Sequence, residues 1–136
     1  MNRNRGSSVK IKTSDLTGVA LDWAVDQIEG LYAEYLERYQ YRLKHNPDGM
    51  NPPTKLDYRA FVQARSLNYH RSWAQMGPII EREGICIVVG MTIYDWWAYI
   101  GEETDKISAD TPLIAAARCH VASKLGDEVE IPEELS

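Results

Sequence analysis

The sequence has few of the features that direct a protein to a membrane, to an export pathway or to duplex nucleic acid. No apolar run within its 136 residues approaches the roughly 20 residues that a membrane-spanning helix needs. The basic N-terminal stretch is not followed by the apolar segment of a signal peptide. The formal net charge of −5 disfavours duplex binding, which needs a positive surface. We therefore expect a cytoplasmic protein with no membrane partner and no duplex ligand.

Cysteine is scarce, and the common catalytic motifs are missing. Cys86 and Cys119 lie in separate apolar stretches without a CxxC spacing, which predicts two buried free thiols. GxGxxG, GxxxxGK[ST], HExxH and GxSxG do not occur. His120 follows Cys119 directly, but adjacent helical side chains point about 100° apart, so the two residues are a poor metal site or dyad. We therefore assign no catalytic residue, metal or cofactor, and expect a binding protein more than an enzyme.

Tyrosine and tryptophan, in contrast, are abundant, and charge is unevenly distributed. Eight Tyr and four Trp accompany a single Phe. These side chains are favoured where one side of the ring stays wet, as at interfaces and ligand clefts, although a half-exposed core is the more common explanation. Residues 31–75 carry seven basic and four acidic groups, whereas residues 101–136 carry three basic and nine acidic groups. The acidic C-terminal part could dock on a basic surface.

The N-terminal half reads as a series of helices. We expect a flexible segment at 1–12, and then a helix that Thr13 or Ser14 caps and Gly30 can end. Asp22 and Asp26 stand four residues apart, opposite the apolar face that includes Trp23. We interpret them as a solvated face rather than as a metal-binding or acid–base pair.

A Tyr-rich helix is predicted for Leu31–Lys44 from its helical spacing of apolar residues. Its apolar surface predicts a homo-oligomer. A loop follows at 46–53, and Thr54 can cap a shorter helix.

The segment SWAQMGPIIEREGI, residues 72–85, combines a good N-cap, Ser72, with a Gly-Pro step that we expect to break the helix. Pro78 would then start a second short helix, which Gly84 ends. Free backbone N–H groups at such a new N-terminus could bind an anion.

The remaining elements complete an α+β domain. β-Branched and aromatic residues between Ile85 and Gly101 predict a β-hairpin, with one of Trp96 and Trp97 facing the core and the other facing away. Thr111, Pro112 and Gly126 delimit a C-terminal helix. Residues 129–131 can form an edge strand. We predict a small single α+β domain over 13–136, with N-terminal helices, a central hairpin or small antiparallel sheet and a C-terminal helix packed on it.

Three segments resemble signature blocks of the NinX family of lambdoid phages: VKIKTSDLTGVALDWAV, WAQMGPIIEREGI and TPLIAAARCHVASKLGDEVEIPEEL. The chain departs from the family pattern at Met76, Ala117 and His120, where the family usually has Gly, Met and Tyr. Residues 31–68 correspond to the variable part. The resemblance implies a phage accessory protein acting in the host cytoplasm, and it implies no reaction. The motif positions that it singles out are Asp22, Trp23, Trp73, Gln75, Pro78, Ile79, Glu81 and Arg118.

Three functional hypotheses follow. The first is a non-enzymatic binding protein that interferes with a host process, for example by sequestering a signalling nucleotide in counter-defence. Aromatic side chains would stack on the base, and Arg82 and Arg118 would bind phosphate. The second is a protein–protein inhibitor or adaptor, and the third a small nucleotide hydrolase using Asp22, Asp26 or Glu81. Arg118 could alternatively pair with Glu81. The candidate ligand-binding residues are Trp23, Trp73, Gln75, Glu81, Arg82, Trp96, Trp97 and Arg118.

Overall fold

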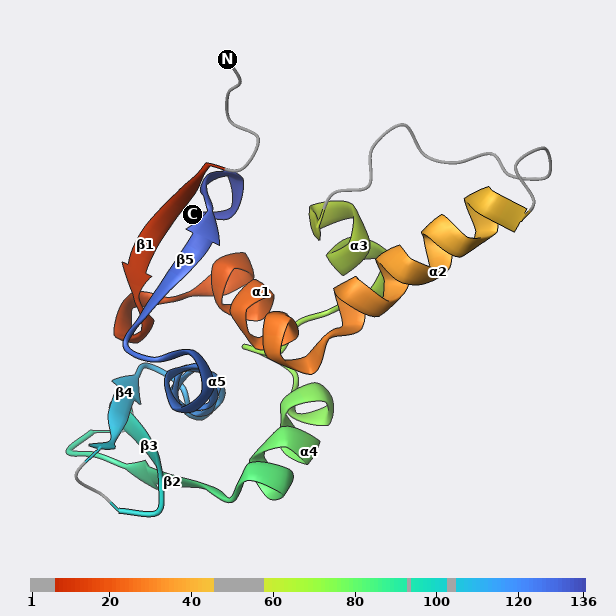
Figure 1. The fold of residues 1–136 in the computed structure, drawn as a ribbon. Coiled ribbons are helices and arrows are strands. Elements are labelled where there is room, and N and C mark those ends of the chain that lie inside the picture. The colour runs from red at the N-terminus through yellow and green to blue at the C-terminus, as the bar shows by residue number, and fades with distance from the viewer. Residues whose placement is uncertain (1–6, 46–57, 93, 103–104) are drawn as a thin grey trace.

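The C-terminal helix α5, Pro112–Leu125, lies at the centre of a computed structural model that describes residues 7–45, 58–92, 94–102 and 105–136 (Figure 1). Its ends follow the sequence signals: the Thr111 side chain accepts a hydrogen bond from the Ile114 N–H, Pro112 occupies the first turn, and Gly126 ends the helix. Three consecutive alanines, residues 115–117, are fully buried. Their small side chains let α5 contact a sheet on one side and helices on the other.

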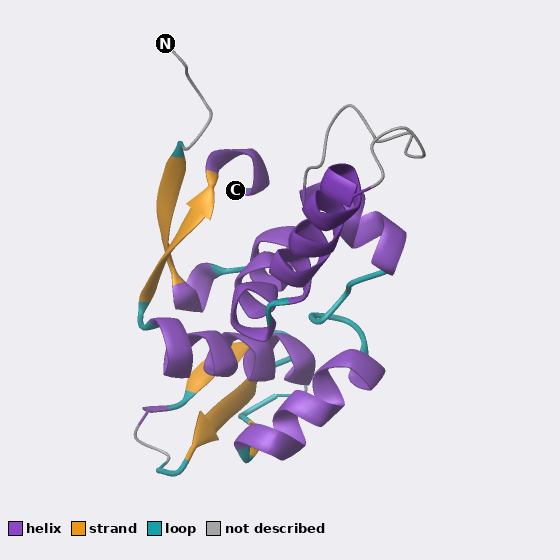
Figure 2. Cartoon of the chain, turned by 45° about the vertical axis from the view of Figure 1, so that its right-hand side comes forward, coloured by secondary structure: helices purple, strands orange, loops and turns teal. Residues whose placement is uncertain are grey.

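A three-stranded antiparallel sheet covers one side of α5 (Figure 2). It consists of β2 (Ile85–Val89), β3 (Trp96–Ile100) and β4 (Ile107–Ala109), in the order β2-β3-β4. The predicted hairpin and the helix packed on it are therefore confirmed. Cys119 is buried as expected, but Cys86 is exposed because it lies on the side of β2 that faces away from α5; both thiols are free.

A second, two-stranded ribbon joins the two ends of the chain. β1 (Ser8–Lys12) pairs antiparallel with β5 (Glu128–Pro132), and the short helix η4 (Glu133–Leu135) follows. We expected residues 1–12 to be flexible, and for residues 8–12 this expectation is wrong because they form β1. Residues 1–6 lie outside the described part of the chain. Lys10 and Lys12 lie opposite Glu130 and Glu128 across the ribbon, and Val129 and Ile131 of β5 are buried. The sequence of residues 8–12 alone could not predict this strand, because its partner lies at the other end of the chain.

The first helix begins later than expected. Thr13–Asp15 form a 3-10 turn, η1, and α1 spans Gly18–Glu29. Thr13 is buried and donates its hydroxyl hydrogen bond to the Gly126 carbonyl, at 2.6 Å, instead of capping α1. Gly30 ends α1, which is one of the roles that the sequence allowed, in the left-handed conformation with φ of 80°.

Helices α2 (Leu31–His45), α3 (Tyr58–Arg65) and α4 (Trp73–Glu83) complete the fold; the predicted loop at 46–53 and the Thr54 cap lie outside the described residues. α4 is continuous, so our prediction of a break at Gly77-Pro78 is wrong. A proline within a helix costs about 3 kcal/mol. That cost is offset because Ser72 caps the helix and Met76 and Ile79 are buried on one face. The proposed anion site at a new helix N-terminus does not exist.

Arg118 of α5 holds distant parts of the chain together. Its Nε donates to the Leu16 carbonyl at 2.8 Å, and one terminal nitrogen donates to the Ser108 carbonyl of β4 at 2.9 Å. The guanidinium group therefore joins the loop before α1 to the sheet. Arg118 does not pair with Glu81, which is exposed on α4, and its role here is structural.

We predict that Arg118→Lys lowers the free energy of unfolding by about 1.5–3 kcal/mol, because a single ammonium group cannot reproduce the fork that reaches both carbonyls. Urea denaturation measures the change. Arg38→Lys is the matched control, since Arg38 makes only an exposed pair with Glu34, and it should change stability by less than about 0.5 kcal/mol. Equal stability of the two variants would contradict the structural role of Arg118.

Candidate ligand pocket at the elbow between the first two helices

Helices α1 and α2 meet at an elbow, the single residue Gly30 (Figure 1). The face of α1 that leads to this elbow carries three carboxylates, on Asp22, Asp26 and Glu29. Asp22 and Asp26 are 2% and 0% exposed. This corrects our interpretation of the two residues as a solvated face, and it raises the question of how each carboxylate is satisfied.

Asp22 is paired with His70 from the connection between α3 and α4. His70 Nδ1 lies 3.0 and 2.9 Å from the two carboxylate oxygens, and the His70 N–H donates to Oδ1 at 3.0 Å. Burial raises the pKa of Asp22, and the hydrogen bonds from His70 oppose that rise. The Tyr58 hydroxyl donates to the Asp22 carbonyl at 3.2 Å. Asp22 thus anchors two later segments on α1.

Asp26 is satisfied at only one oxygen. Its Oδ2 accepts a hydrogen bond from the Tyr32 N–H at 3.1 Å, which caps the start of α2. Its Oδ1 is buried and has no hydrogen-bond partner in the described part of the chain. Burial raises the pKa of Asp26, and burial together with the charge of Asp26 also raises the pKa of Tyr58 and Tyr69.

Glu29 is the centre of an ionic chain that links three helices. It accepts two hydrogen bonds from Arg82, at 3.0 and 2.8 Å, and lies 3.0 Å from His120 Nε2. Arg82 and Lys124 both pair with Glu83, at 2.8 and 3.1 Å. Burial raises the pKa of Glu29, but the hydrogen bonds from Arg82 and His120 outweigh it and lower the pKa overall. Burial lowers the pKa of His120, which favours a neutral imidazole.

Gln75 has a separate structural role in the connection before α4. Its side-chain nitrogen donates to the Ser66 carbonyl at 2.7 Å, and its side-chain oxygen accepts from the Asn68 N–H at 2.6 Å. The amide therefore clamps a turn that includes Ser66, whose φ of 56° is unusual for a residue with a side chain.

Two small cavities flank the elbow. The first, which we name the Trp23 pocket, has a volume of about 340 Å³. The second, the Arg82 cleft, has a volume of about 310 Å³. Both volumes are at the lower end of the range for small-molecule sites, about 300–1,000 Å³. The lining of the Trp23 pocket includes Trp23, Asp26, Gln27, Gly30, Tyr32 and Leu36, and that of the Arg82 cleft includes Glu29, Leu31, Tyr69, Gln75, Pro78 and Arg82.

The structure places three of the eight sequence-predicted residues at these cavities: Trp23 in the pocket, and Gln75 and Arg82 in the cleft. Trp73 and Glu81 are exposed on α4 and line neither of them.

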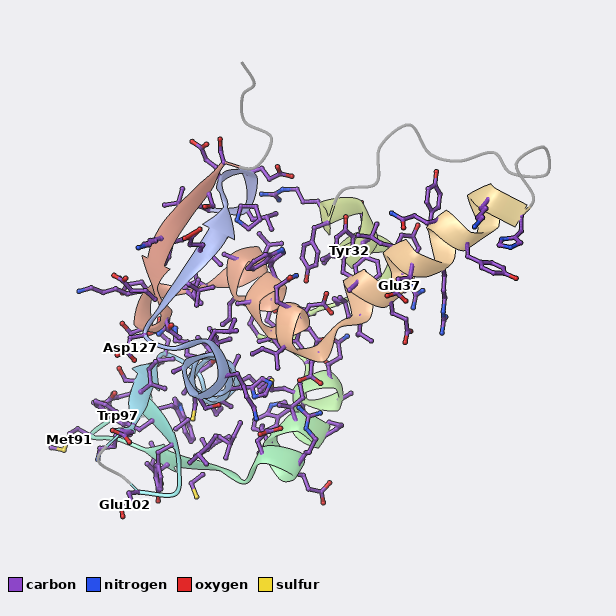
Figure 3. The ribbon with its side chains drawn as sticks, in the orientation of Figure 1. Tyr32, Glu37, Met91, Trp97, Glu102 and Asp127 are labelled. Carbon is purple, nitrogen blue, oxygen red and sulfur yellow. The ribbon has the colours of Figure 1, made fainter. Side chains whose placement is uncertain are left out.

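The other two tryptophans lie in the sheet on the far side of α5. Trp96 packs against the core, and Trp97 lies on the opposite face with Lys106 Nζ 5.4 Å from its ring centre (Figure 3). The two rings therefore face opposite sides of β3, as predicted, and neither belongs to the elbow.

Sequence reasoning missed His70 and Glu29 and misplaced Asp26. A signal was available for two of them, because Asp22, Asp26 and Glu29 follow an i, i+4, i+7 spacing and so share one helix face. Nothing in the sequence indicated that this face is buried. The pairing of Asp22 with His70 joins residues 48 positions apart.

The fold and its cavities define a small α+β protein with room for a small ligand beside a buried acidic helix face. In the described residues, no helix is long and apolar enough to cross a membrane. Over the same residues, no cluster of three or more His, Cys, Asp or Glu side chains could hold a metal ion.

A search of curated proteins finds no match. The family model described as Bacteriophage P22, NinX matches residues 12–124. The chain therefore belongs to the NinX family of phage proteins.

We predict that Arg82→Ala lowers the free energy of unfolding by about 1 kcal/mol, because Glu29 loses two charge-assisted hydrogen bonds while half of the Arg82 side chain is exposed and screened by water. Chemical denaturation measures this change in the free energy of unfolding. The control is Arg38→Ala, which removes an exposed i,i+4 pair with Glu34 and should cost at most about 0.5 kcal/mol. An Arg82→Ala protein as stable as the control would show that the ionic chain contributes nothing.

We also predict that Asp26→Asn weakens the pH dependence of stability. The folded pKa of Asp26 is raised above its ordinary value of 3.8, so the folded state keeps a proton that the unfolded chain releases. The contribution of Asp26 to the free energy of unfolding is therefore fully present below pH 3.8, and it is lost as the pH rises through the folded pKa. Urea denaturation between pH 4 and pH 7 should give a smaller fall in stability for Asp26→Asn than for the parent. An unchanged slope in Asp26→Asn would contradict the assignment.

Proposed function

We propose that this phage protein is a non-enzymatic binding protein that captures a small ligand in the Trp23 pocket. The ligand class that suits the pocket is a flat ring bearing N–H donors, such as the base of a signalling nucleotide. Capture of such a signal would interfere with a host process, and counter-defence is the role that we propose for it.

The observation that carries this proposal is the unpaired Oδ1 of Asp26, in a residue that lines the pocket. A buried acceptor without a partner costs about 1–3 kcal/mol. Oδ1 has almost no accessible surface, so a ligand N–H donor would reach it only after the pocket wall shifts. That contact would remove the cost, and a charged acceptor makes the stronger type of hydrogen bond. Adenine, guanine and cytosine each carry an exocyclic amino group of the required kind.

Two aromatic side chains support binding of a ring. Trp23 is half-buried in the pocket lining, and Tyr32 lines the same pocket from the first turn of α2. Tyr32 packs edge-on against Tyr58 and Phe61, with ring centroids 5.3 and 5.1 Å away. These contacts fix its orientation before a ligand arrives. Stacking on such side chains contributes about 1–3 kcal/mol per base.

Recognition in this proposal depends on the base and not on phosphate. Arg118 is bound to two main-chain carbonyls, and Arg82 is bound to Glu29 and Glu83. Both guanidinium groups are therefore engaged within the protein, so the proposal assigns no phosphate contact to either of them.

Calorimetric titration with the monophosphates of adenosine, guanosine, cytidine and uridine tests the proposal. We expect binding of at least one amino-bearing base, and at least a tenfold loss of affinity in both Asp26→Asn and Trp23→Ala. Trp73→Ala, which removes an exposed tryptophan outside the pocket, should bind like the parent. Native mass spectrometry of protein from infected cells would identify the natural ligand. Affinities that Asp26→Asn and Trp23→Ala leave unchanged would refute the pocket assignment.

A second candidate is a protein–protein inhibitor, favoured by the exposed acidic groups at the C-terminal end. Five carboxylates are exposed there, on Asp127, Glu128, Glu130, Glu133 and Glu134. Such a surface suits a basic partner, whose binding should weaken steeply with salt. Salt-independent binding of a host protein, or binding unaffected by Glu133→Lys with Glu134→Lys, would count against this candidate.

A further inference from the structure

One strand edge in this protein lacks the protection that the others have. Strand β2 pairs with β3 on one side, and no strand of the described chain lies on its other side. It runs near the lower margin of the molecule in Figure 1. Its sequence, ICIVV, contains only apolar residues, four of them β-branched, and no Pro or charge. Exposed edges of this composition tend to pair with another strand.

The other edges are blocked by residues that discourage pairing. β1 and β5 carry Lys10, Lys12, Glu128 and Glu130, and β5 ends at Pro132. Charges and proline are the usual means of protecting an edge. At β4, Arg118 covers the edge by binding the Ser108 carbonyl. The absence of any such device at β2 is therefore specific to that strand.

The hydrogen-bond register shows which backbone groups of β2 are unpaired. The Gly90 N–H bonds to the Asp95 carbonyl, and this register continues along β2 and β3, with Val88 opposite Trp97. Antiparallel pairs alternate between hydrogen-bonded and non-hydrogen-bonded. Ile85, Ile87 and Val89 therefore direct their N–H and C=O groups away from β3. The same alternation puts the Ser108 carbonyl on the outer edge of β4, where Arg118 binds it.

We propose that β2 pairs with β2 of a second copy of this chain, antiparallel about a two-fold axis at Ile87, to form one continuous six-stranded sheet. This register places Ile85 opposite Val89 of the second copy and Ile87 opposite its own equivalent, so all five residues pair. About six main-chain hydrogen bonds would form. A two-fold contact satisfies both edges at once and closes the assembly at a dimer.

The residues beside this edge favour a second copy as the occupant. Val89, Met91 and Tyr94 are 53%, 94% and 74% exposed, and Met91 projects from the margin of the molecule (Figure 3). In the two-fold arrangement, Val89 comes next to Ile85 of the second copy, which gives this exposed side chain an apolar neighbour. Every cross-strand pair is apolar, and no like charges face each other along the strand.

A pair of substitutions at Val89 tests the proposal. Val89→Pro removes an N–H that points away from β3, so the β2–β3 ladder keeps its bonds while pairing with a second copy is blocked. Val89→Ala keeps that N–H and is the matched control. Light scattering of the full chain should give twice the chain mass of 15.5 kDa for the parent and Val89→Ala, and the chain mass for Val89→Pro. Near-ultraviolet circular dichroism checks the fold, and Val89→Lys replaces Val89→Pro if that variant unfolds.

Amide hydrogen exchange locates the contact. In the dimer, the amides of Ile87 and Val89 should be protected, and the protection should be lost on dilution, whereas Cys86 and Val88 stay protected throughout. A parent protein that is monomeric at all concentrations would overturn the proposal. The proposal would also be overturned if Val89→Pro folds and still dimerises, or if the Ile87 amide exchanges rapidly in the dimer. Binding of an unrelated peptide to the β2 edge of a monomer would overturn it as well.

Discussion

The three carboxylates on α1, two buried and one half-buried, are the constraint on which the rest of the helical layer depends. A charged group removed from water needs a partner, and each of these obtains it from a different part of the chain. Asp22 takes His70, Asp26 takes the first turn of α2, and Glu29 takes Arg82 and the imidazole of α5. One helix face thereby fixes the positions of α2, the α3–α4 connection, α4 and α5.

This arrangement accounts for the polar residues of the segment WAQMGPIIEREG, which no single secondary-structure preference explains. Gln75 clamps the turn before α4, Arg82 reaches Glu29, and Glu83 connects Arg82 with Lys124. Pro78 lies at the rim of the Arg82 cleft within an unbroken helix. The segment is therefore mainly a structural connector, and the ligand proposal depends on the opposite side of the elbow, at Trp23.

Local signals predicted the elements that depend on local physics. The N-cap, Pro and Gly around α5 defined that helix, and the β-branched run with Gly90 defined the hairpin. Features that depend on distant partners could not be predicted. β1 exists because of β5, and α4 stays whole because Met76 and Ile79 are buried. Only three of the eight proposed site residues line the elbow cavities. The abundance of aromatic residues indicated half-exposed rings, but it could not predict which of them lie close together.

The account of the site depends on one atom, the unpaired Oδ1 of Asp26. The most direct test is a nuclear magnetic resonance titration of the Asp26 carboxyl carbon, first alone and then with adenosine monophosphate. The account predicts a pKa above the ordinary 3.8 in the free protein. It also predicts a fall in that pKa on ligand binding, because a donated N–H stabilises the carboxylate. An ordinary pKa in the free protein, or a bound ligand that leaves the pKa unchanged, would contradict it.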